Sequence, residues 1–486
     1  GSDCGEVPAG ASEDDLAFLE NYPAQPTADE RRRMRQLCAV EPPAPWQVLA
    51  VTFTNKAAKE LRERLEAFGI AGAGDIWALT FHSACVRILR RDIDKRGFSN
   101  DFTIYDTDDC KRVVKDILKE MDLDEKTFSP REVLAVISKA KDELLSPQDF
   151  SKKWAGSGDW KRERVAKIYE RYDRILCEAN ALDFDDLILH TVRLLQNEPD
   201  VRAYYQRKFR YILIDEYQDT NRMQYELVRL LADGHRNICV VGDPAQTIYS
   251  FAGASSYNLL NFASEFGPLT ADVRLNNDYR STPQIVNYAN RVLEASPQRA
   301  DYLKLNSKRD QGRRVAQTVY NSDLEEARGV AARIRRLVDE GASPGDCAIL
   351  TRVNAQQKIL CRALGEQHLR YRVKRDSGWQ NSALADDAQT RLAMLEALGA
   401  GGDVKGVTIS TIHASKGLEF KHVFLIGCSE GLIPYGSPPE GDLLEEERRL
   451  MYVAVTRAED TLDVSYARAR EDDGSDRGRR KSRFFR

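Results

Sequence analysis

The sequence predicts an α/β protein built on parallel sheets. Two observations support this class: short apolar runs rich in β-branched residues, and helical patterns that follow several of these runs directly. Alternation of strand and helix is typical of parallel strands that helices cover on both faces. A chain of 486 residues exceeds one compact core, so we expect two to four domains.

The first half of the chain alternates as this class requires. We expect strands at 47–53, 77–81, 211–215 and 237–242, and helices at 29–37, 56–68 and 83–91. Between 92 and 180 the strand signals nearly vanish and helical periodicity dominates, with helices expected at 108–121 and 161–180. We therefore interpret 92–180 as a helical insertion into the first α/β domain.

A second α/β unit starts near Leu275. We expect a helix at 324–339 and strands at 347–351, 407–411 and 423–426. Residues 374–405 are rich in Ala, Gly and Asp, which favours a linker with one helix. The charged tail at 472–486 has a basic end and is expected to be frayed.

Composition limits the classes of partner. The 72 Lys and Arg residues against 76 Asp and Glu give a net charge of −4, so nucleic acid would have to bind in a local basic groove. Nine cysteines without a CxxC pair argue against a disulfide framework or zinc site and favour the reducing cytoplasm. No apolar run of about 18 residues predicts a membrane span, so no membrane partner is expected.

Two adjacent carboxylates, Asp215 and Glu216, end the apolar run that starts at Tyr211. In open α/β sheets ligands bind beyond the carboxyl ends of the strands. The first acid could hold Mg²⁺, and the second could orient or deprotonate the water that attacks a phosphoryl group. The alternative is a capped strand end followed by a solvated loop.

The run Val240–Gly242 leads into a second polar loop that contains Gln246. A neutral amide there could contact a terminal phosphate oxygen and respond to its loss. Tyr249 and Phe251 follow, and aromatic rings beside a phosphate site suit base stacking, worth about 1–3 kcal/mol per base. Ordinary core packing is the alternative for both rings.

Two arginines stand out by their context. Arg280 begins the second α/β unit, and Arg457 lies on an apolar helix, where a guanidinium needs an anionic partner. Two arginines that reach across a cleft would stabilise charge on a transferring γ-phosphate. An inter-domain salt bridge is the alternative.

The segment from Thr411 to Glu419 follows a strand and offers hydroxyl and backbone donors to phosphates, with Gly417 in its centre. His413, in the same segment, could equally be a satisfied buried histidine.

Taken in order, these segments resemble the UvrD/PcrA/Rep family of superfamily 1 DNA helicases. The matching strings are Thr52-Phe-Thr-Asn-Lys-Ala-Ala58, Thr80-Phe-His-Ser83, Ile214-Asp-Glu-Tyr-Gln-Asp-Thr220, Val241-Gly-Asp-Pro-Ala-Gln-Thr-Ile-Tyr249, Asp278-Tyr-Arg-Ser-Thr282, Thr411-Ile-His-Ala-Ser-Lys-Gly-Leu-Glu-Phe420 and Glu446-Glu-Arg-Arg-Leu-Met-Tyr-Val-Ala-Val-Thr-Arg457. The resemblance implies two RecA-like motor domains, the first with a helical insertion. It also implies ATP between them, single-stranded DNA across their top and 3′→5′ movement.

The resemblance also implies a role for each matched position. Asp215 would bind Mg²⁺, Glu216 would be the catalytic carboxylate, Gln246 the γ-phosphate sensor, and Arg280 and Arg457 the arginine fingers. Glu419 and Gly417 would lie near the nucleotide, and Gln25 would read adenine. The residues implied to contact DNA are Phe53, Thr54, Asn55, His82, Tyr249, Phe251, Thr411 and His413.

The implied domain boundaries follow the same order. The first motor comprises 1–91 and 181–274 with the insertion 92–180, the second motor comprises 275–373 and 406–471, a shortened linker spans 374–405, and the basic tail spans 472–486.

Three departures from the family pattern qualify this picture. The phosphate loop GxxxxGK[ST] occurs nowhere in the chain, and residues 26–45, where it is expected, contain no Gly and no Lys. The linker is much shorter than the family's helical regulatory subdomain. Ala252 stands where the family usually has Arg.

Two functions therefore remain open. The first is an ATP-dependent 3′→5′ DNA helicase or translocase that uses Mg²⁺ and acts on single-stranded DNA and single-strand/duplex junctions with repair or replication proteins. The second is a single-stranded-DNA-binding scaffold that does not hydrolyse ATP. A helicase–nuclease subunit would need a further acidic metal-binding domain, which the sequence does not predict.

Overall fold

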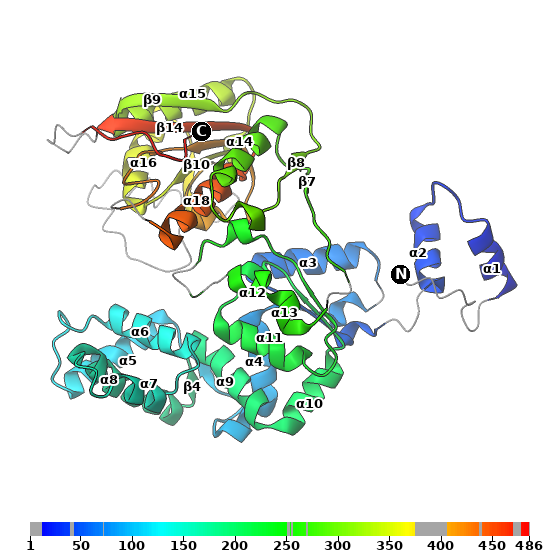
Figure 1. Ribbon diagram of the computed structural model, residues 1–486, viewed down its shortest axis with the longest axis vertical. Coiled ribbons are helices and arrows are strands. Elements are labelled where there is room, and N and C mark those ends of the chain that lie inside the picture. The colour runs from blue at the N-terminus through cyan, green and yellow to red at the C-terminus, as the bar shows by residue number, and fades with distance from the viewer. Residues whose placement is uncertain are drawn as a thin grey trace. The chain divides into compact units, whose positions relative to one another are not determined.

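The structure is a computed structural model that describes residues 12–38, 43–70, 72–249, 253, 256–268, 271–374, 406–436, 440–469 and 478–485 (Figure 1). These residues fall into two compact units. The first comprises residues 1–141, 145–215 and 226–241, and the second comprises 142–144, 216–225 and 242–486. Residues 375–405 of the expected linker, Phe251 and Ala252 lie outside the described residues.

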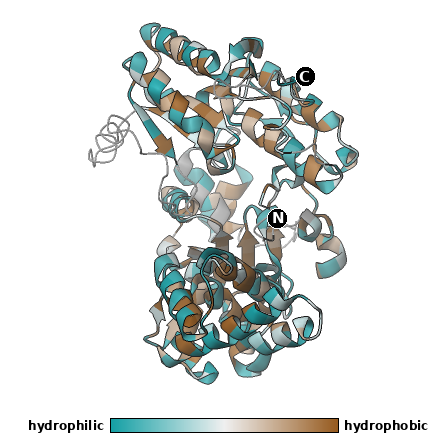
Figure 2. Cartoon of the chain, turned by 90° about the vertical axis from the view of Figure 1, so that its left-hand side faces the viewer, coloured by the Kyte–Doolittle hydropathy of each residue, from teal (hydrophilic) through white to brown (hydrophobic). Residues whose placement is uncertain are grey.

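A four-stranded parallel sheet forms the centre of the first unit. Its order is β2 (Trp77–Thr80), β1 (Val48–Thr52), β5 (Tyr211–Ile214) and β6 (Ile238–Val240). Val51 pairs with Leu79 on one side and with Ile214 on the other. Most residues of these strands are apolar and appear brown in Figure 2. Because the strands are parallel, their carboxyl ends share one edge of the sheet.

The strands alternate with helices, as the sequence predicts. The helices outside the insertion are α1 (Glu13–Glu20), α2 (Ala28–Leu37), α3 (Asn55–Ala67), α4 (Phe81–Asp92), α9 (Phe184–Asn197), α10 (Pro199–Lys208) and α11 (Arg222–Ala232), through which the division between the units passes. The hydroxyl of Thr54 accepts the N–H of Ala57 at 3.1 Å and so caps the start of α3.

One face of this sheet is less covered than the alternation predicts. Ile212 and Ile214 of β5 are buried, but Tyr211 and Leu213 on the opposite face are 38% and 41% exposed. Cys239, which pairs with Leu213, is exposed as well. The expectation that both faces are covered was therefore wrong at β5, because no helix of the described residues packs fully over these side chains.

The strand-poor region holds four helices that lie between two short parallel strands. These elements are β3 (Thr103–Ile104), α5 (Thr107–Glu120), α6 (Pro130–Asp142), α7 (Pro147–Trp154), α8 (Trp160–Glu178) and β4 (Ala181–Leu182). Apolar side chains from all four helices form one buried cluster. The insertion therefore has its own hydrophobic core.

A buried ammonium group ties this insertion to helix α9. Lys141, at the end of α6, is 1% exposed, and its Nζ lies 2.7 Å from Asp183 and 2.6 Å from Asp186. Tyr172 donates to Asp183 at 2.9 Å, and Asp183 also caps α9. Burial alone would lower the pKa of Lys141, but the two carboxylates hold it well above its usual value.

The second unit is built on a six-stranded, all-parallel sheet. Its order is β11 (Tyr371–Lys374), β12 (Val407–Thr411), β10 (Cys347–Thr351), β13 (Phe420–Leu425), β14 (Ala458–Ala469) and β9 (Ala316–Ser322). The remaining elements are α12 (Ser256–Leu260), α13 (Phe262–Phe266), β7 (Asn277–Asp278), α14 (Pro283–Glu294), β8 (Asn306–Ser307), α15 (Asp323–Asp339), α16 (Gln357–Glu366) and α18 (Asp442–Val455). Strands β9, β11 and β14 were not anticipated from the sequence.

The tail is ordered where the structure describes it. Lys481 forms an antiparallel bridge with Ser429, and Arg483 lies 2.7 Å from Glu430. Phe484 and Phe485 are buried against the core of the second unit. The expectation of a frayed tail was therefore wrong for residues 478–485, because burial of two aromatic rings outweighs the charged composition.

No helix within the described residues combines the length and the apolar composition that crossing a membrane requires.

Removing the buried cation tests the role of Lys141. Lys141→Ala would leave Asp183 and Asp186 buried without their partner, and breaking a buried pair in this way costs about 3–5 kcal/mol. We expect faster amide hydrogen exchange in α6 and α9, measured by mass spectrometry. The matched control is Lys111→Ala, because the partner of Lys111 is an exposed carboxylate. If amide hydrogens of α6 and α9 exchange equally fast in both variants, Lys141 does not hold these helices together.

Candidate functional site

The carboxyl edge of the first sheet carries expected side chains from three neighbouring strands. Phe53 follows β1, His82 lies in the first turn of α4 after β2, and Asp215 follows β5. The Asp215 N–H donates to the Val51 carbonyl at 3.0 Å, which extends the pairing of β5 with β1 to the edge. Parallel pairing therefore brings these three positions to one edge, as the strand order predicts.

The histidine and aromatic residues at this edge have ring partners. Phe53 contacts Phe81 at 5.4 Å between ring centroids, and His82 contacts Phe184 at 5.8 Å. Burial lowers the pKa of His82, which favours its neutral form. A neutral imidazole beside aromatic rings is suited to stacking rather than to charge pairing.

In the second unit, Gln218 fixes the backbone around the proposed catalytic acid. Glu216 has a left-handed backbone conformation, with φ of 53°, just before the turn η4 (Tyr217–Asp219). Gln218 Nε2 donates to the Glu216 carboxylate at 2.5 Å, and Gln218 Oε1 accepts the N–H of Asp243 at 3.0 Å. A Cβ on Gly242 would lie 2.6 Å from Gln218 Oε1, so a larger residue there would displace the Gln218 amide.

Lys416 lies among these acidic groups, although the sequence analysis assigned it no role. Its side chain is 6% exposed, and its Nζ lies 2.5 Å from Asp219, 3.7 Å from Glu216 and 2.7 Å from the Gln246 carbonyl oxygen. Burial raises the pKa of Asp219 to about 6, even though Lys416 opposes this shift. Lys416 stands inside a matched string, but nothing in the string indicates which acid it contacts.

The proposed phosphate sensor belongs to the same network. Gln246 ends the turn η5 (Pro244–Gln246), and its Nε2 donates to Asp243 at 2.9 Å. Asp243 also accepts the N–H of Ala245 at 2.9 Å, and burial raises its pKa. The amide of Gln246 is thus oriented by a carboxylate whose other oxygen caps the turn.

Tyr249 and His413 lie side by side in the second unit. The Tyr249 hydroxyl donates to the His413 carbonyl at 3.1 Å, and the two rings are 6.3 Å apart. Burial, with a smaller effect from Arg352, lowers the pKa of His413 to about 4. His413 is thus neutral at physiological pH, in keeping with the alternative of a buried histidine.

The two proposed arginine fingers have different partners. Arg280 Nη2 lies 2.6 Å from Glu419, and its Nε donates to the same carboxylate at 2.7 Å. Arg457 is buried and donates to the carbonyl oxygens of Val453 and Leu418, each at 3.0 Å. Burial, followed by the charge of Arg280, lowers the pKa of Arg457 to about 10. The structure brings Arg457 into electrostatic range of Arg280 within one unit.

The other expected residues occupy loop positions. Thr411 accepts the N–H of Ala414 at 3.1 Å and so shapes the turn η10 (His413–Ser415). Gly417 has φ of 76°, a conformation that favours glycine. Gln25 lies exposed between α1 and α2 in the first unit.

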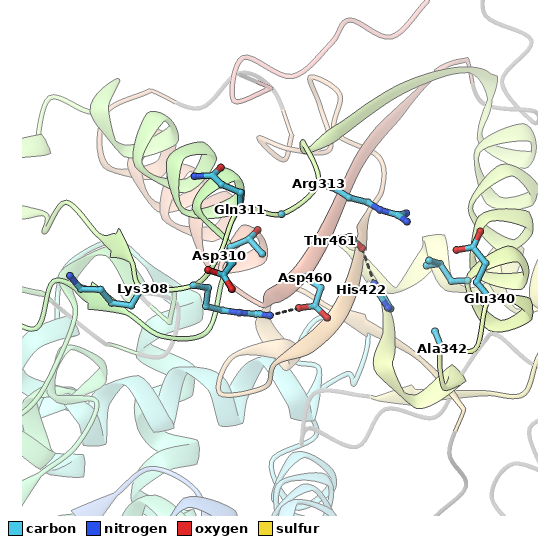
Figure 3. A pocket seen from close by; sticks show the side chains of 13 residues that line it. Lys308, Asp310, Gln311, Arg313, Glu340, Ala342, His422, Asp460 and Thr461 are labelled. Atoms are coloured by element: carbon cyan, nitrogen blue, oxygen red, sulfur yellow. Dashed lines mark hydrogen bonds and ion pairs between the residues drawn. The ribbon is translucent and has the colours of Figure 1, made fainter.

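A cavity of about 620 Å³ opens elsewhere in the second unit (Figure 3). It lies near the amino ends of β13 and β14, where His422 and Thr461 line it. Its charged side chains balance, with three cations (Lys308, Arg309 and Arg313) and three acids (Asp310, Glu340 and Asp460). None of the residues expected to bind nucleotide lines it, although Thr282 and Asp460 in its wall lie close in the chain to Arg280 and Arg457.

The donor set is compatible with magnesium bound together with phosphates. No cluster of three or more His, Cys, Asp or Glu within the described residues is arranged to hold a metal alone. Mg²⁺ commonly uses one or two carboxylates and takes its other ligands from substrate phosphates and water. The exposed carboxylate of Asp215 fits that requirement.

The ion pair between Lys416 and Asp219 predicts a pH-dependent loss of stability. Lys416→Met would leave Asp219 buried without a cation, which costs about 3–5 kcal/mol once that carboxyl is ionised. The folded-state pKa of Asp219 already exceeds its reference value of 3.8, and the substitution raises it further. The stability of Lys416→Met should therefore fall steadily as pH rises from 5 to 8, measured by chemical unfolding.

The double variant Lys416→Met/Asp219→Asn is the control. It carries no ionisable side chain at either position, so it should lose most of this added pH dependence. If the stability of Lys416→Met changes with pH in the same way as that of the native chain, the ion pair is contradicted.

Comparison with known proteins identifies the family. The sequence model of the UvrD/REP helicase N-terminal domain matches residues 32–267, and that of the UvrD-like helicase C-terminal domain matches 273–378 and 388–469. Together these matches cover most of the chain and both described units.

Curated relatives agree with this assignment. The chain is 44% identical over 342 residues to the ATP-dependent DNA helicase PcrA of Bacillus subtilis (strain 168), an alignment that covers 70% of this chain and 46% of that protein. It is 32% identical over 590 aligned positions to PcrA of Staphylococcus aureus (strain MRSA252), covering 91% of this chain and 80% of that protein. The chain thus spans less than half of the length of the first relative and four fifths of the second. It belongs to the UvrD/Rep family of helicases.

Proposed function

We propose that this chain is an ATP-dependent DNA helicase or translocase that moves 3′→5′ on single-stranded DNA. Its matched relatives are named ATP-dependent DNA helicases. The observation that carries the proposal is the environment of Arg457. This guanidinium is 3% exposed and has no carboxylate within ion-pair distance among the described residues.

A buried cation with no carboxylate in direct contact is costly, and Glu216 and Glu419 act on Arg457 only at longer range. An anionic ligand beside Arg457 would remove that cost. Arg280 acts on Arg457 through charge repulsion, so both cations reach the same region of the second unit. A terminal phosphate carries charge in the transition state of phosphoryl transfer, and paired arginines stabilise such charge. The role of arginine finger suits Arg457 better than the role of a structural salt bridge.

The acidic network supplies the remaining groups. Glu216 would accept the proton of the attacking water, and its carboxylate is held in place by the Gln218 amide at 2.5 Å. The side-chain amide of Gln246, which Asp243 holds in place, would contact the terminal phosphate. Asp215 would hold Mg²⁺, which when bound neutralises phosphate charge.

DNA would contact the carboxyl edges of both sheets. In the first unit the candidates are Phe53, Thr54, Asn55 and His82, and in the second they are Tyr249, Thr411 and His413, with Phe251 beyond the described residues. Neutral imidazoles and aromatic rings suit base stacking, which tolerates any sequence. The chain would also act at single-strand/duplex junctions, together with repair or replication proteins, and in the cytoplasm.

A scaffold that binds single-stranded DNA without hydrolysing ATP is the second candidate. The absence of GxxxxGK[ST] from the sequence favours it, because the β- and γ-phosphates would lose their usual lysine. Lys416 cannot take that place without leaving Asp219, from which its Nζ is 2.5 Å away. The helicase would hydrolyse ATP and the scaffold would not, whereas both would bind DNA.

The variant Glu216→Gln separates the candidates. It removes the proton acceptor while keeping the size of the side chain, so DNA-stimulated phosphate release from Mg·ATP should fall by about 10² or more. Binding of a labelled oligonucleotide, measured by fluorescence anisotropy, should not change.

The matched control is Glu265→Gln, because Glu265 accepts a hydrogen bond from the half-buried Tyr225 and not from a residue of the acidic network. Full turnover in Glu216→Gln would falsify the catalytic role. A native chain that binds DNA but releases no phosphate would establish the scaffold instead.

A further inference from the structure

Three cations crowd around an aromatic cluster in the first unit, apart from all the residues discussed above. The guanidinium of Arg87 lies 5.2 Å from the ring of Trp77, and the ammonium of Lys208 lies 4.2 Å from the same ring. Arg91 lies 3.5 Å from the ring of Tyr204. We call Arg87, Arg91 and Lys208 the cationic cluster.

The cluster joins β2 and α4, which follow each other directly in the chain, to the distant helix α10. Trp77 begins β2, Arg87 and Arg91 lie on α4, and Lys208 ends α10, where the ring of Phe209 contacts Trp77 at 5.0 Å (Figure 1). Trp77 stands at the amino end of its strand, so the cluster lies at the opposite end of the sheet from His82. The 12 residues of α4 span about 18 Å at 1.5 Å per residue.

Positive charge dominates this surface. Among the described residues, Asp92 is the carboxylate that pairs with the cluster, 3.7 Å from Arg91 and already bound by the Tyr205 hydroxyl. Arg87 and Arg91 are exposed, and Lys208 is half-buried. Burial and then the charges of Arg91 and Arg87 lower the pKa of Lys208. Three cations thus share one carboxylate in a chain whose net charge is −4.

Structural roles account for only part of this arrangement. Cations in the last turn of a helix offset its dipole, but Arg87 lies before the last turn of α4. A cation over an exposed ring gains about 0.5–1 kcal/mol, yet a ring neutralises no charge. Two cations on one Trp77 ring and a third beside them therefore repel one another unless an anion lies between them.

We propose that Arg87, Arg91 and Lys208 form a second nucleic-acid contact, which binds phosphates of a DNA strand at the amino end of the first sheet. The rings are already covered by cations, so the contact is to the backbone rather than to the bases. Such a contact carries no sequence preference and is strongly salt-dependent. It extends the region of DNA contact along α4, beyond the carboxyl edge to which His82 belongs.

The test is the salt dependence of binding to a fluorescein-labelled oligothymidylate between about 50 and 200 mM salt. Each phosphate contact to a single strand contributes about 0.7 to the slope of log K against log salt, so Arg87→Gln/Arg91→Gln/Lys208→Gln should lower the slope by about two. The charge-preserving Arg87→Lys/Arg91→Lys/Lys208→Arg should retain it. An unchanged slope in the first variant, or an equal loss in the second, would overturn the proposal.

A matched control removes three cations from α5 of the same unit, the half-buried Lys111 and the exposed Arg112 and Lys119, as Lys111→Gln/Arg112→Gln/Lys119→Gln. It should leave the slope unchanged. Inorganic pyrophosphate is the second probe. Pyrophosphate could displace the oligonucleotide more than chloride of equal ionic strength does, and do so in the native chain but not in the neutral cluster variant. That result would identify a free polyphosphate as the ligand and overturn the assignment to a strand.

The outcome is independent of the proposed motor function. If the carboxyl edge binds DNA, Phe53→Ala/His82→Ala should lower the affinity for the oligonucleotide. Adding the three cluster substitutions to that double variant should then lower the slope of log K against log salt further. If the double background changes nothing while the cluster variant still lowers the slope, the proposed DNA path fails and the cluster stands.

Discussion

The ammonium group of Lys416 joins the parts of the second unit that carry its chemistry. It contacts the turn that follows Glu216, the carbonyl of Gln246 and the ring of Tyr249, and it reaches them from the loop after β12. Each of those loops is polar and follows the end of a strand. Without a central cation, Asp219 would be a buried carboxylate with no ion pair, and the turn that positions Glu216 would lose its anchor.

Buried charges are treated differently in different parts of the molecule. Lys141 and Lys416 each have carboxylate partners at 2.7 Å or less, which is how proteins usually stabilise buried cations. The buried Arg457 has backbone carbonyls instead, and the cationic cluster, which is largely exposed, has aromatic rings. Partners that orient a cation without neutralising it leave its charge available to a ligand. This contrast distinguishes structural cations from those for which we propose a phosphate.

Parallel strands explain why a short list of loops holds many of the expected residues. Their carboxyl ends meet at one edge, so residues that follow different strands become neighbours. Phe53, His82 and Asp215 reach the edge of the first sheet in this way, and Thr411 and His413 reach that of the second. The amino ends of the strands obey the same geometry, which brings Trp77 and Phe209 together beneath the cationic cluster.

The sequence by itself determined the α/β class, the strand-poor insertion, most strands of the two main sheets and the loops that hold Glu216, Gln246 and Arg280, whereas Arg457 was expected on a helix and lies just beyond the end of α18. These features depend on local periodicity and on motifs within a few residues, which a sequence displays directly. Only the tertiary structure decided which side chains meet across long separations. Lys416 contacts Asp219 across 197 positions, and Lys208 lies beside Trp77. It also decided that the charged tail is anchored by Phe484 and that one face of β5 is partly open. Such outcomes depend on burial and on the sum of many contacts, and no local pattern encodes them.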